Sequence, residues 1–292
     1  MEKIDRLGWA AGISFVSHGV RLGIRATEPA VLEDVRKHLP LGWKPISSSA
    51  VDHLYSLVVG GHAPSSRIRR FHLLYAGSGR LVRSTELGEV FGVLQEDLHF
   101  TVAFEARRRL FVRAGVVGWR GKAIVIIGPN RDEATRLVAA LIRGGAAYYS
   151  DTFAAFDPDG RAHPYPAPIS LRGTAGDGQN NLPVEELGGR VGRKPLPVGL
   201  IVAMDYGPGA PWRSRALMPA QAVLTLLAHS MLPRSRPSFT LAVLARVAAT
   251  ARALKAKCGE AESAATALLG YLERDSERWV SMPFNLKGEV IL

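Results

Sequence analysis

One short segment of the sequence has the residue types and the spacing for binding a phosphate group. It follows the apolar run 123–127 and reads Gly128-Pro129-Asn130-Arg131-Asp132-Glu133-Ala134-Thr135. In the phosphate-loop pattern a glycine is followed by four residues, a second glycine, a lysine, and a serine or threonine. A helix that begins after such a turn offers unpaired amide groups and the positive end of its dipole. The spacing therefore predicts a phosphate site here, with the members Gly128, Asn130, Arg131 and Thr135.

Two positions of this segment depart from the pattern. Glu133 stands where the pattern has its second glycine, and Ala134 stands where it has lysine. A charge pair about 4 Å apart is worth about 4 kcal/mol at an effective dielectric of about 20, so losing the lysine and adding a carboxylate weakens ATP binding substantially. Arg131 and Arg113 add positive charge, but neither occupies the position of the lysine. We therefore expect the usual binding of ATP to be lost.

Asp151 is the candidate catalytic residue. It ends a strand-like segment that begins at Tyr148, where a carboxylate can act as a base or bind magnesium together with the Thr135 hydroxyl. An ordinary turn cap is the other interpretation of Asp151, and the sequence leaves both open.

The eight histidines include no pair with metal-ligand spacing, and the single cysteine, Cys258, excludes a disulfide framework or a cysteine-rich zinc site.

The elements that must position these residues form a strand–helix–strand sequence. Residues 123–127 are a continuous β-branched apolar run, which is typical of a strand buried on both faces of a sheet. Residues 132–142 have the periodicity of a helix, which ends at Gly144-Gly145. A strand begins at Tyr148, and 196–204 predict another buried strand. The expected fold class is α/β, built around a βαβ unit.

The remaining elements suggest two parts, an N-terminal α+β portion at 1–105 and a domain at 106–292 with C-terminal helices. Strands or hairpins are predicted at 13–25, 54–59, 70–75 and 80–82. Helices are predicted at 28–39, 86–98, 100–110, 219–231, 239–256 and 263–273. Residues 158–195 are rich in loops, and their stretch 173–181 fits either a substrate-side segment or a plain connector.

The charge balance favours anionic partners. The 292 residues contain 37 Lys and Arg against 26 Asp and Glu, a net charge of +11. Codon bias toward Ala, Arg and Gly on a solvated surface explains such an excess equally well. The basic clusters 107–109 and 246–257 are either solvated faces or contacts to an acidic protein partner. Nucleic acid is less favoured, because no RNA-binding aromatic motif accompanies them.

No apolar run is long enough for a membrane span. The N-terminus is charged and lacks the apolar stretch of a signal peptide. We therefore expect no membrane span and a cytoplasmic location.

Several segments, taken in order, resemble the HPr kinase/phosphorylase-related family. They are Phe111-Val112-Arg113-Ala114-Gly115-Val116-Val117, Tyr149-Ser150-Asp151, 164–172 and 195–200, with 19–25 and 39–43 similar to the family's leader portion. The resemblance covers residues 105–260 and implies a P-loop kinase domain of the phosphoenolpyruvate-carboxykinase-like type. Members of that family use ATP and magnesium to phosphorylate a hydroxyl.

The departures from the family lie at its functional positions, while the apolar scaffold between them is intact. Arg113 replaces a histidine of the family, Glu133 and Ala134 replace the glycine and lysine, and Asp151-Thr152 keeps one carboxylate of two. The resemblance therefore implies a pseudokinase-like binding or regulatory subunit of a bacterial pathway. For such a subunit we expect a protein or peptide partner with an acidic surface, and the resemblance is consistent with homo- or hetero-oligomers. The alternative is an active transferase or repurposed enzyme that uses ATP and magnesium on a protein, peptide or small anionic substrate.

Overall fold

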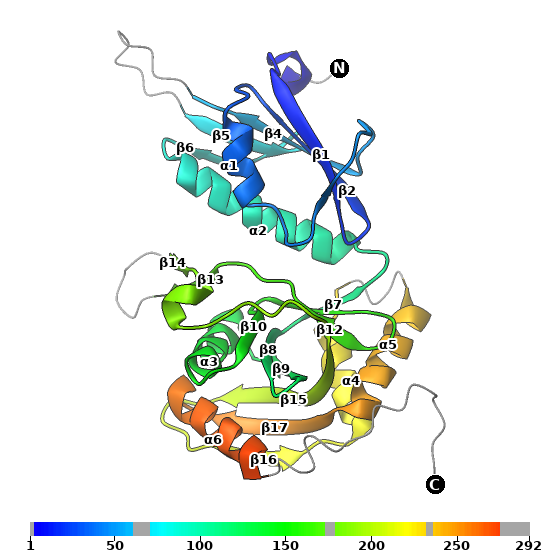
Figure 1. Ribbon diagram of the computed structural model, residues 1–292, viewed down its shortest axis with the longest axis vertical. Helices are drawn as coiled ribbons and strands as arrows, with labels where there is room; N and C mark the ends of the chain where they lie inside the picture. Colours follow the sequence, from blue (N-terminus) through cyan, green and yellow to red (C-terminus); the bar gives the residue numbers. More distant parts are fainter. Residues whose placement is uncertain (1–2, 61–70, 173–178, 232–235, 275–292) are drawn as a thin grey trace. The chain divides into compact units, whose positions relative to one another are not determined.

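A computed structural model describes residues 3–60, 71–172, 179–231 and 236–274 of the chain. The chain divides into an N-terminal unit, Met1–Arg108, and a C-terminal unit, Arg109–Leu292 (Figure 1). Both units combine helices with mixed sheets, so the fold is α/β as expected. The predicted boundary after residue 105 coincides with the end of helix α2, Leu87–Glu105.

The N-terminal unit is a six-stranded sheet with two helices packed on it. The strand order is β3-β1-β2-β4-β5-β6, in which β2 and β4 run parallel and the other neighbours antiparallel. The strands are β1 Ala11–Ser17, β2 Val20–Ala26, β3 Lys44–Pro45, β4 His53–Val58, β5 His72–Ala76 and β6 Gly79–Ser84, preceded by the short helix η1 Lys3–Arg6. Helix α1, Val31–Lys37, meets α2 where the rings of His38 and Phe91 stack 4.9 Å apart. The predicted hairpin in 13–25 is confirmed by β1 and β2.

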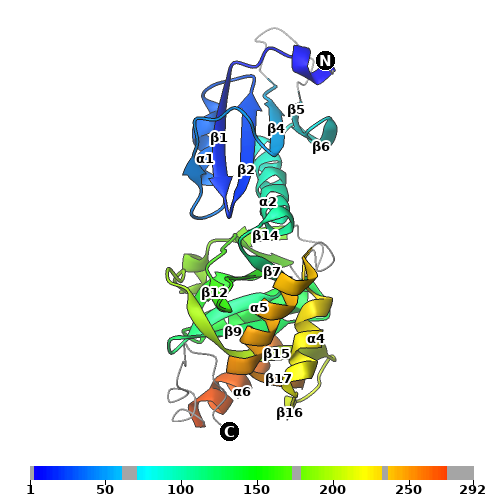
Figure 2. The ribbon, with the colours of Figure 1, turned by 90° about the vertical axis from the view of Figure 1, so that its right-hand side faces the viewer.

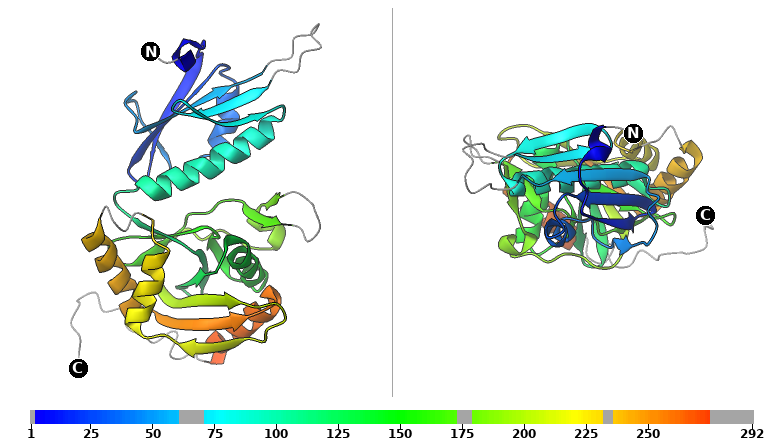
Figure 3. Two further views of the ribbon diagram at one scale, coloured as in Figure 1. Left: turned by 180° about the vertical axis from the view of Figure 1, so that it is seen from behind. Right: turned by 90° about the horizontal axis from the view of Figure 1, so that it is seen from above.

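The separate helices predicted at 86–98 and 100–110 are wrong, because α2 runs without a break (Figure 3). Its buried side chains Val90, Leu94, Leu98 and Val102 recur every four residues along one face. His99, at the expected break, is buried inside the helix. The helix ends before the arginines 107–109, and the chain then enters a strand at Leu110.

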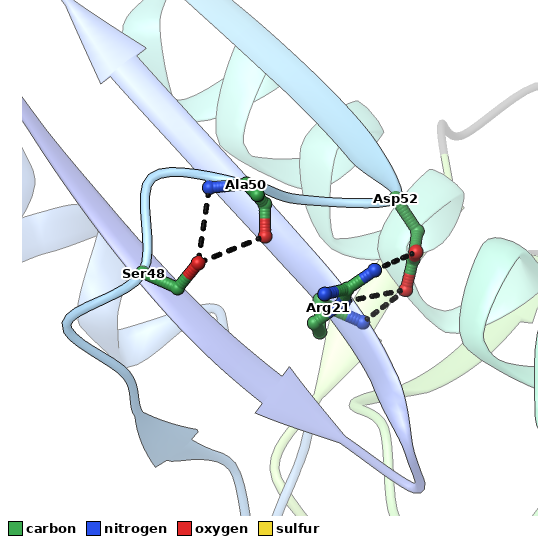
Figure 4. Close-up of polar contacts among 4 residues, drawn as sticks. All are labelled: Arg21, Ser48, Ala50 and Asp52. Atoms are coloured by element: carbon green, nitrogen blue, oxygen red, sulfur yellow. Dashed lines mark hydrogen bonds and ion pairs between the residues drawn. The ribbon is translucent and has the colours of Figure 1, made fainter.

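An ion pair joins β2 to the segment that leads into β4. The Arg21 guanidinium and backbone amide both donate to Asp52, with Nη2 2.9 Å from Oδ1 and the amide nitrogen 3.0 Å from Oδ2 (Figure 4). The amide of Asp52 donates in turn to the Arg21 carbonyl at 2.8 Å. Just upstream, the Ser48 hydroxyl turns the chain by accepting the Ala50 amide at 3.1 Å. These bonds fix the register in which β2 and β4 pair.

We expect Asp52 to contribute to the acid stability of the N-terminal unit. Its hydrogen bonds from the Arg21 side chain and backbone lower its pKa to about 2, below the ordinary value of 3.8. The stabilisation is therefore complete above pH 3.8 and is lost as the pH falls toward 2. Asp52→Asn should flatten this part of the unfolding profile measured by circular dichroism against pH. Glu28→Gln, at an exposed carboxylate, serves as the control, and an equal flattening there would contradict the assignment.

The C-terminal unit contains a branched nine-stranded sheet between two pairs of helices. One path runs β10-β8-β9-β15, and β17 and then β16 continue beyond β15, while β12, β11 and β7 branch from the start of β15. The strands are β7 Leu110–Arg113, β8 Gly115–Trp119, β9 Lys122–Ile127, β10 Ala147–Ser150, β11 Phe153–Phe156, β12 Arg161–His163, β15 Leu196–Tyr206, β16 Arg213–Ala216 and β17 Arg252–Cys258. A separate pair, β13 Ile169–Arg172 and β14 Gln179–Leu182, and the turn η2 Val184–Leu187 lie within the region predicted as loops.

Four helices cover the two faces of this sheet. Helices α3, Arg131–Arg143, and α6, Ala261–Arg274, pack on one face against Ile124, Leu200 and Leu254. Helices α4, Pro219–Ala228, and α5, Pro237–Thr250, lie side by side on the other face (Figure 2). The helix predicted at 263–273 is confirmed by α6, and that predicted at 219–231 is confirmed except for its last turn.

The helix predicted at 239–256 is wrong in its second half. Helix α5 ends at Thr250, and Arg252–Cys258 form β17, parallel to β15. Along β17, Leu254, Ala256 and Cys258 are buried while Lys255 and Lys257 are exposed, which is the two-residue period of a strand. The predicted basic helical face therefore does not exist, because Arg246 lies on α5 and the lysines lie on a sheet.

The predicted βαβ unit is present in a split form. Strand β9 leads through α3 to β10, and the two strands point the same way, but β8 lies between them and pairs antiparallel with both. The turn from β8 to β9 uses Arg120 and Gly121, whose φ angles of 46° and 81° are both positive, as in a tight two-residue hairpin. The β15 strand then pairs parallel with β9 on its other side.

No helix in the described parts of the chain has the length and apolarity needed to cross a membrane. Of the stretch 173–181 singled out from the sequence, residues 173–178 lie outside the described residues, and the rest belongs to β14.

Candidate functional site

The connection between β9 and α3 consists of Gly128, Pro129 and Asn130 alone. Helix α3 begins at Arg131, so the positions of the second glycine, the lysine and the threonine all lie in the helix. The Asn130 side chain caps it, with Oδ1 accepting from the Glu133 amide at 3.0 Å. A Cβ at Gly128 would lie 2.9 Å from the Asn130 carbonyl oxygen and 3.1 Å from the Ala134 Cβ, so the turn is closed tightly over the helix. One of the amides that would face a phosphate is thus bonded within the chain.

Thr135 and Asp151 are brought together, and they bind each other. The Thr135 hydroxyl donates to Asp151 Oδ2 at 3.2 Å, between α3 and the end of β10. The Tyr148 hydroxyl lies 3.0 Å from Asp151 Oδ1, and the Thr152 hydroxyl lies 3.1 Å from the same oxygen. Thr135 and Asp151 are 0% and 2% exposed and Tyr148 is 1% exposed, so these three residues are closed to solvent, while Thr152 is partly exposed.

Burial dominates the electrostatics of this group. It raises the pKa of Asp151 above its ordinary value, while the charge of Arg131 and the surrounding hydroxyls act in the opposite direction. Burial likewise raises the pKa of Tyr148. The Tyr148 hydroxyl has one proton, and it lies 2.7 Å from the Ala167 carbonyl oxygen as well as near Asp151. That proton can therefore go to only one of these two acceptors at a time.

The two arginines predicted to support a phosphate site lie in different surroundings. Arg131 is exposed at the first turn of α3, and its charge acts on Asp151. Arg113 is exposed at the end of β7, where its amide donates to the His229 carbonyl at 2.8 Å. Burial, and then the charge of Arg113, lower the pKa of His229. The two cations therefore influence different titratable groups.

A cavity of about 340 Å³ lies beside Glu133, at the carboxyl ends of β15 and β17. It is lined by Glu133, Arg136, Ala139, Arg143, Leu171, Met204, Tyr206 and residues 259–262. One carboxylate oxygen of Glu133, Oε2, is buried without a hydrogen-bond partner. Open α/β sheets bind ligands at this edge. The sequence pattern does not predict this site, because most of the strand before Gly259 has the composition of a helix.

The cavity and the buried carboxyl are separate features, since neither Asp151 nor Thr135 lines the cavity. Within the residues that the structure describes, no three His, Cys, Asp or Glu side chains gather closely enough to hold a metal ion. Thr135 and Asp151, the predicted magnesium ligands, supply one hydroxyl and one carboxylate, and both are already bonded to each other.

Comparison with known proteins adds no relative from which a role could be transferred to these residues. No protein-family model matches the chain, and no curated protein matches it.

Proposed function

We propose that this chain is a non-catalytic binding protein, a pseudokinase-like regulatory subunit whose C-terminal unit derives from an HPr-kinase-like P-loop domain. The proposal requires neither ATP nor magnesium. The observation that supports it best is the burial of Thr135 and Asp151, which are 0% and 2% exposed and bonded to each other, because neither group is open to a magnesium ion from solvent. A partner with an acidic surface is consistent with the net charge of +11.

The first turn of α3 supports the same proposal. Asp132 and Glu133 stand at the positive end of the helix dipole, where carboxylates stabilise a helix and compete with a bound anion. A triphosphate placed about 4 Å from the Glu133 carboxylate would meet a repulsion of about 4 kcal/mol at an effective dielectric of about 20. The matching lysine attraction is missing because position 134 is alanine.

An active transferase with a rearranged site is the second candidate. The raised pKa of Asp151 is its supporting observation, because buried carboxyl groups with perturbed pKa values recur in active sites. A substrate hydroxyl must reach the base, however, and Asp151 is 2% exposed and does not line the cavity. The binding protein is therefore the better-supported function.

Titration with Mg·ATP tests the proposal. We expect no heat of binding by calorimetry and no change in melting temperature at millimolar nucleotide. The reason is that the Asn130 cap and the Asp132 and Glu133 carboxylates occupy the start of α3, where the phosphates would bind. Transfer of labelled γ-phosphate to any protein or peptide acceptor should also be absent. Low-micromolar binding that Thr135→Val abolishes, or phosphate transfer that Asp151→Asn abolishes, would overturn the proposal in favour of the second candidate.

A further inference from the structure

The edge of the C-terminal sheet carries four cations on one face. Strand β16 pairs antiparallel with β17, and the register sets Arg213 opposite Lys257 and Arg215 opposite Lys255. Directly opposed residues of an antiparallel pair project to the same face, and so do residues two apart in a strand. All four side chains belong to exposed residues. We call this set, Arg213, Arg215, Lys255 and Lys257, the basic ribbon; the two strands that carry it, β16 and β17, are labelled in Figure 1.

The charges of the basic ribbon are not balanced within the unit. Like charges directly opposite each other destabilise a sheet, and here two such pairs follow one another. The register of β15 brings one carboxylate, Asp205, beside Lys257. Across the described ranges of the chain, none of the four cations has an ion pair within 4.0 Å. We therefore expect the arrangement to cost folding stability, as functional surfaces often do.

Strand β16 also has an open backbone edge. Among the described strands it pairs with β17 alone, so its other side presents amide and carbonyl groups. An extended peptide can add to such an edge as a further strand, with main-chain bonds for affinity and side chains for specificity. Carboxylates at alternate positions of that peptide would lie along the same face as the four cations, because both chains share the two-residue period.

We propose that the basic ribbon binds an acidic, extended segment of a partner protein, which adds to the sheet along β16. This inference rests on the proposed binding function and assigns it a surface and a partner chemistry. A single-stranded nucleic acid fits the ribbon less well, because such binding uses aromatic side chains on which bases stack. The aromatic residue next to β16, Trp212, is partly buried and packs on the core.

Binding of a labelled peptide in which Glu alternates with Thr tests the inference, with fluorescence anisotropy as the readout. The full-length protein should bind the peptide, and affinity should fall as salt is added. The double variant Arg213→Glu/Arg215→Glu should weaken binding about tenfold or more. The control variant Arg190→Glu/Arg193→Glu makes the same change in net charge at two exposed arginines elsewhere in the unit and should retain binding.

The melting temperature gives a second readout that needs no ligand. Arg213→Glu/Arg215→Glu converts both like-charge pairs into opposite-charge pairs, so this variant should melt above the wild type, whereas the control should not. Absence of peptide binding, or equal loss in both variants, overturns the inference, as does tighter ribbon-dependent binding of a single-stranded oligonucleotide. The Mg·ATP titration has its own outcome, so failure here with no nucleotide binding would reject the basic ribbon and leave the proposed function standing.

Discussion

Replacing Gly192 by alanine is expected to lower the free energy of unfolding of the C-terminal unit by roughly 3 kcal/mol, near the upper end for over-packed cores. A Cβ at this position would lie 2.0 Å from Tyr149 Cε2 and 2.4 Å from its Cζ. Neither the backbone at Gly192 nor the Tyr149 ring can move easily to relieve this clash. The Gly192 amide is bonded to the Tyr148 carbonyl at 2.7 Å, and the buried Tyr149 ring is held by its hydroxyl, 2.7 Å from the Lys194 carbonyl.

A second glycine, Gly118, also packs against the Tyr149 ring and leaves it no space to move away from position 192. A Cβ at Gly118, in β8, would lie 2.8 Å from the same Cε2 atom. The Tyr149 ring therefore fits only because both neighbouring segments have glycine at the point of contact. Chemical denaturation of Gly192→Ala should show the loss directly. Gly270→Ala, in the middle of α6, is the matched control, and it should stabilise the protein by up to about 1 kcal/mol because its Cβ meets nothing closer than 3.7 Å.

A double-mutant cycle separates this clash from a general intolerance of alanine. In a Tyr149→Ala background the ring is gone, so Gly192→Ala should cost less than about 1 kcal/mol. An unchanged cost of roughly 3 kcal/mol in that background would mean that the backbone of position 192, rather than the ring, requires glycine.

The parts of the fold that the sequence predicts well are those whose signal is local. The run 123–127 is β-branched and apolar throughout, and Asn130 with Gly144-Gly145 delimits the helix after it, so β9 and α3 follow from neighbouring residues alone. Strand β17 has no such signal, because its Ala and Lys residues favour a helix. Its strand conformation depends on parallel pairing with β15, where Leu200 is opposite Arg252 and Tyr206 opposite Cys258. A contact that distant in sequence cannot be derived from the periodicity of a short segment.

The candidate site shows the same division. The sequence predicts Thr135 and Asp151 as joint magnesium ligands, and the structure brings the two residues together. Tyr148 was missed, because its hydroxyl reaches Asp151 only through the pleat and bulge of β10, which no spacing rule encodes. Helix α3 begins at Arg131, one residue before the predicted start. This difference matters for the site, because Asn130 is then the N-cap and its side chain accepts the Glu133 amide that a phosphate would otherwise bind.

Asp151→Ala is expected to destabilise the C-terminal unit by about 1–3 kcal/mol, the cost of one unsatisfied buried donor. The substitution leaves the Thr135 hydroxyl in a buried space without its acceptor, whereas the Tyr148 hydroxyl keeps the Ala167 carbonyl oxygen at 2.7 Å. The Thr152 hydroxyl loses its bond as well. Asp151→Asn keeps the shape and one acceptor oxygen, and its amide can donate to Thr135, so the asparagine variant should retain most of the stability that alanine loses.

The pH dependence of Asp151→Asn then shows whether the charge of Asp151 is needed. Because burial raises its pKa above 3.8, the folded state holds the proton more tightly than the unfolded state does. The contribution of Asp151 to stability should therefore decrease as the pH rises from 3.8 through its folded pKa and stay constant above it. The asparagine variant lacks this loss, so its stability relative to the wild type should improve between acid and neutral pH in denaturation curves. If instead it is as unstable as Asp151→Ala at neutral pH, the attraction between ionised Asp151 and Arg131 outweighs burial. The carboxylate would then be held charged, as a general base or a metal ligand must be.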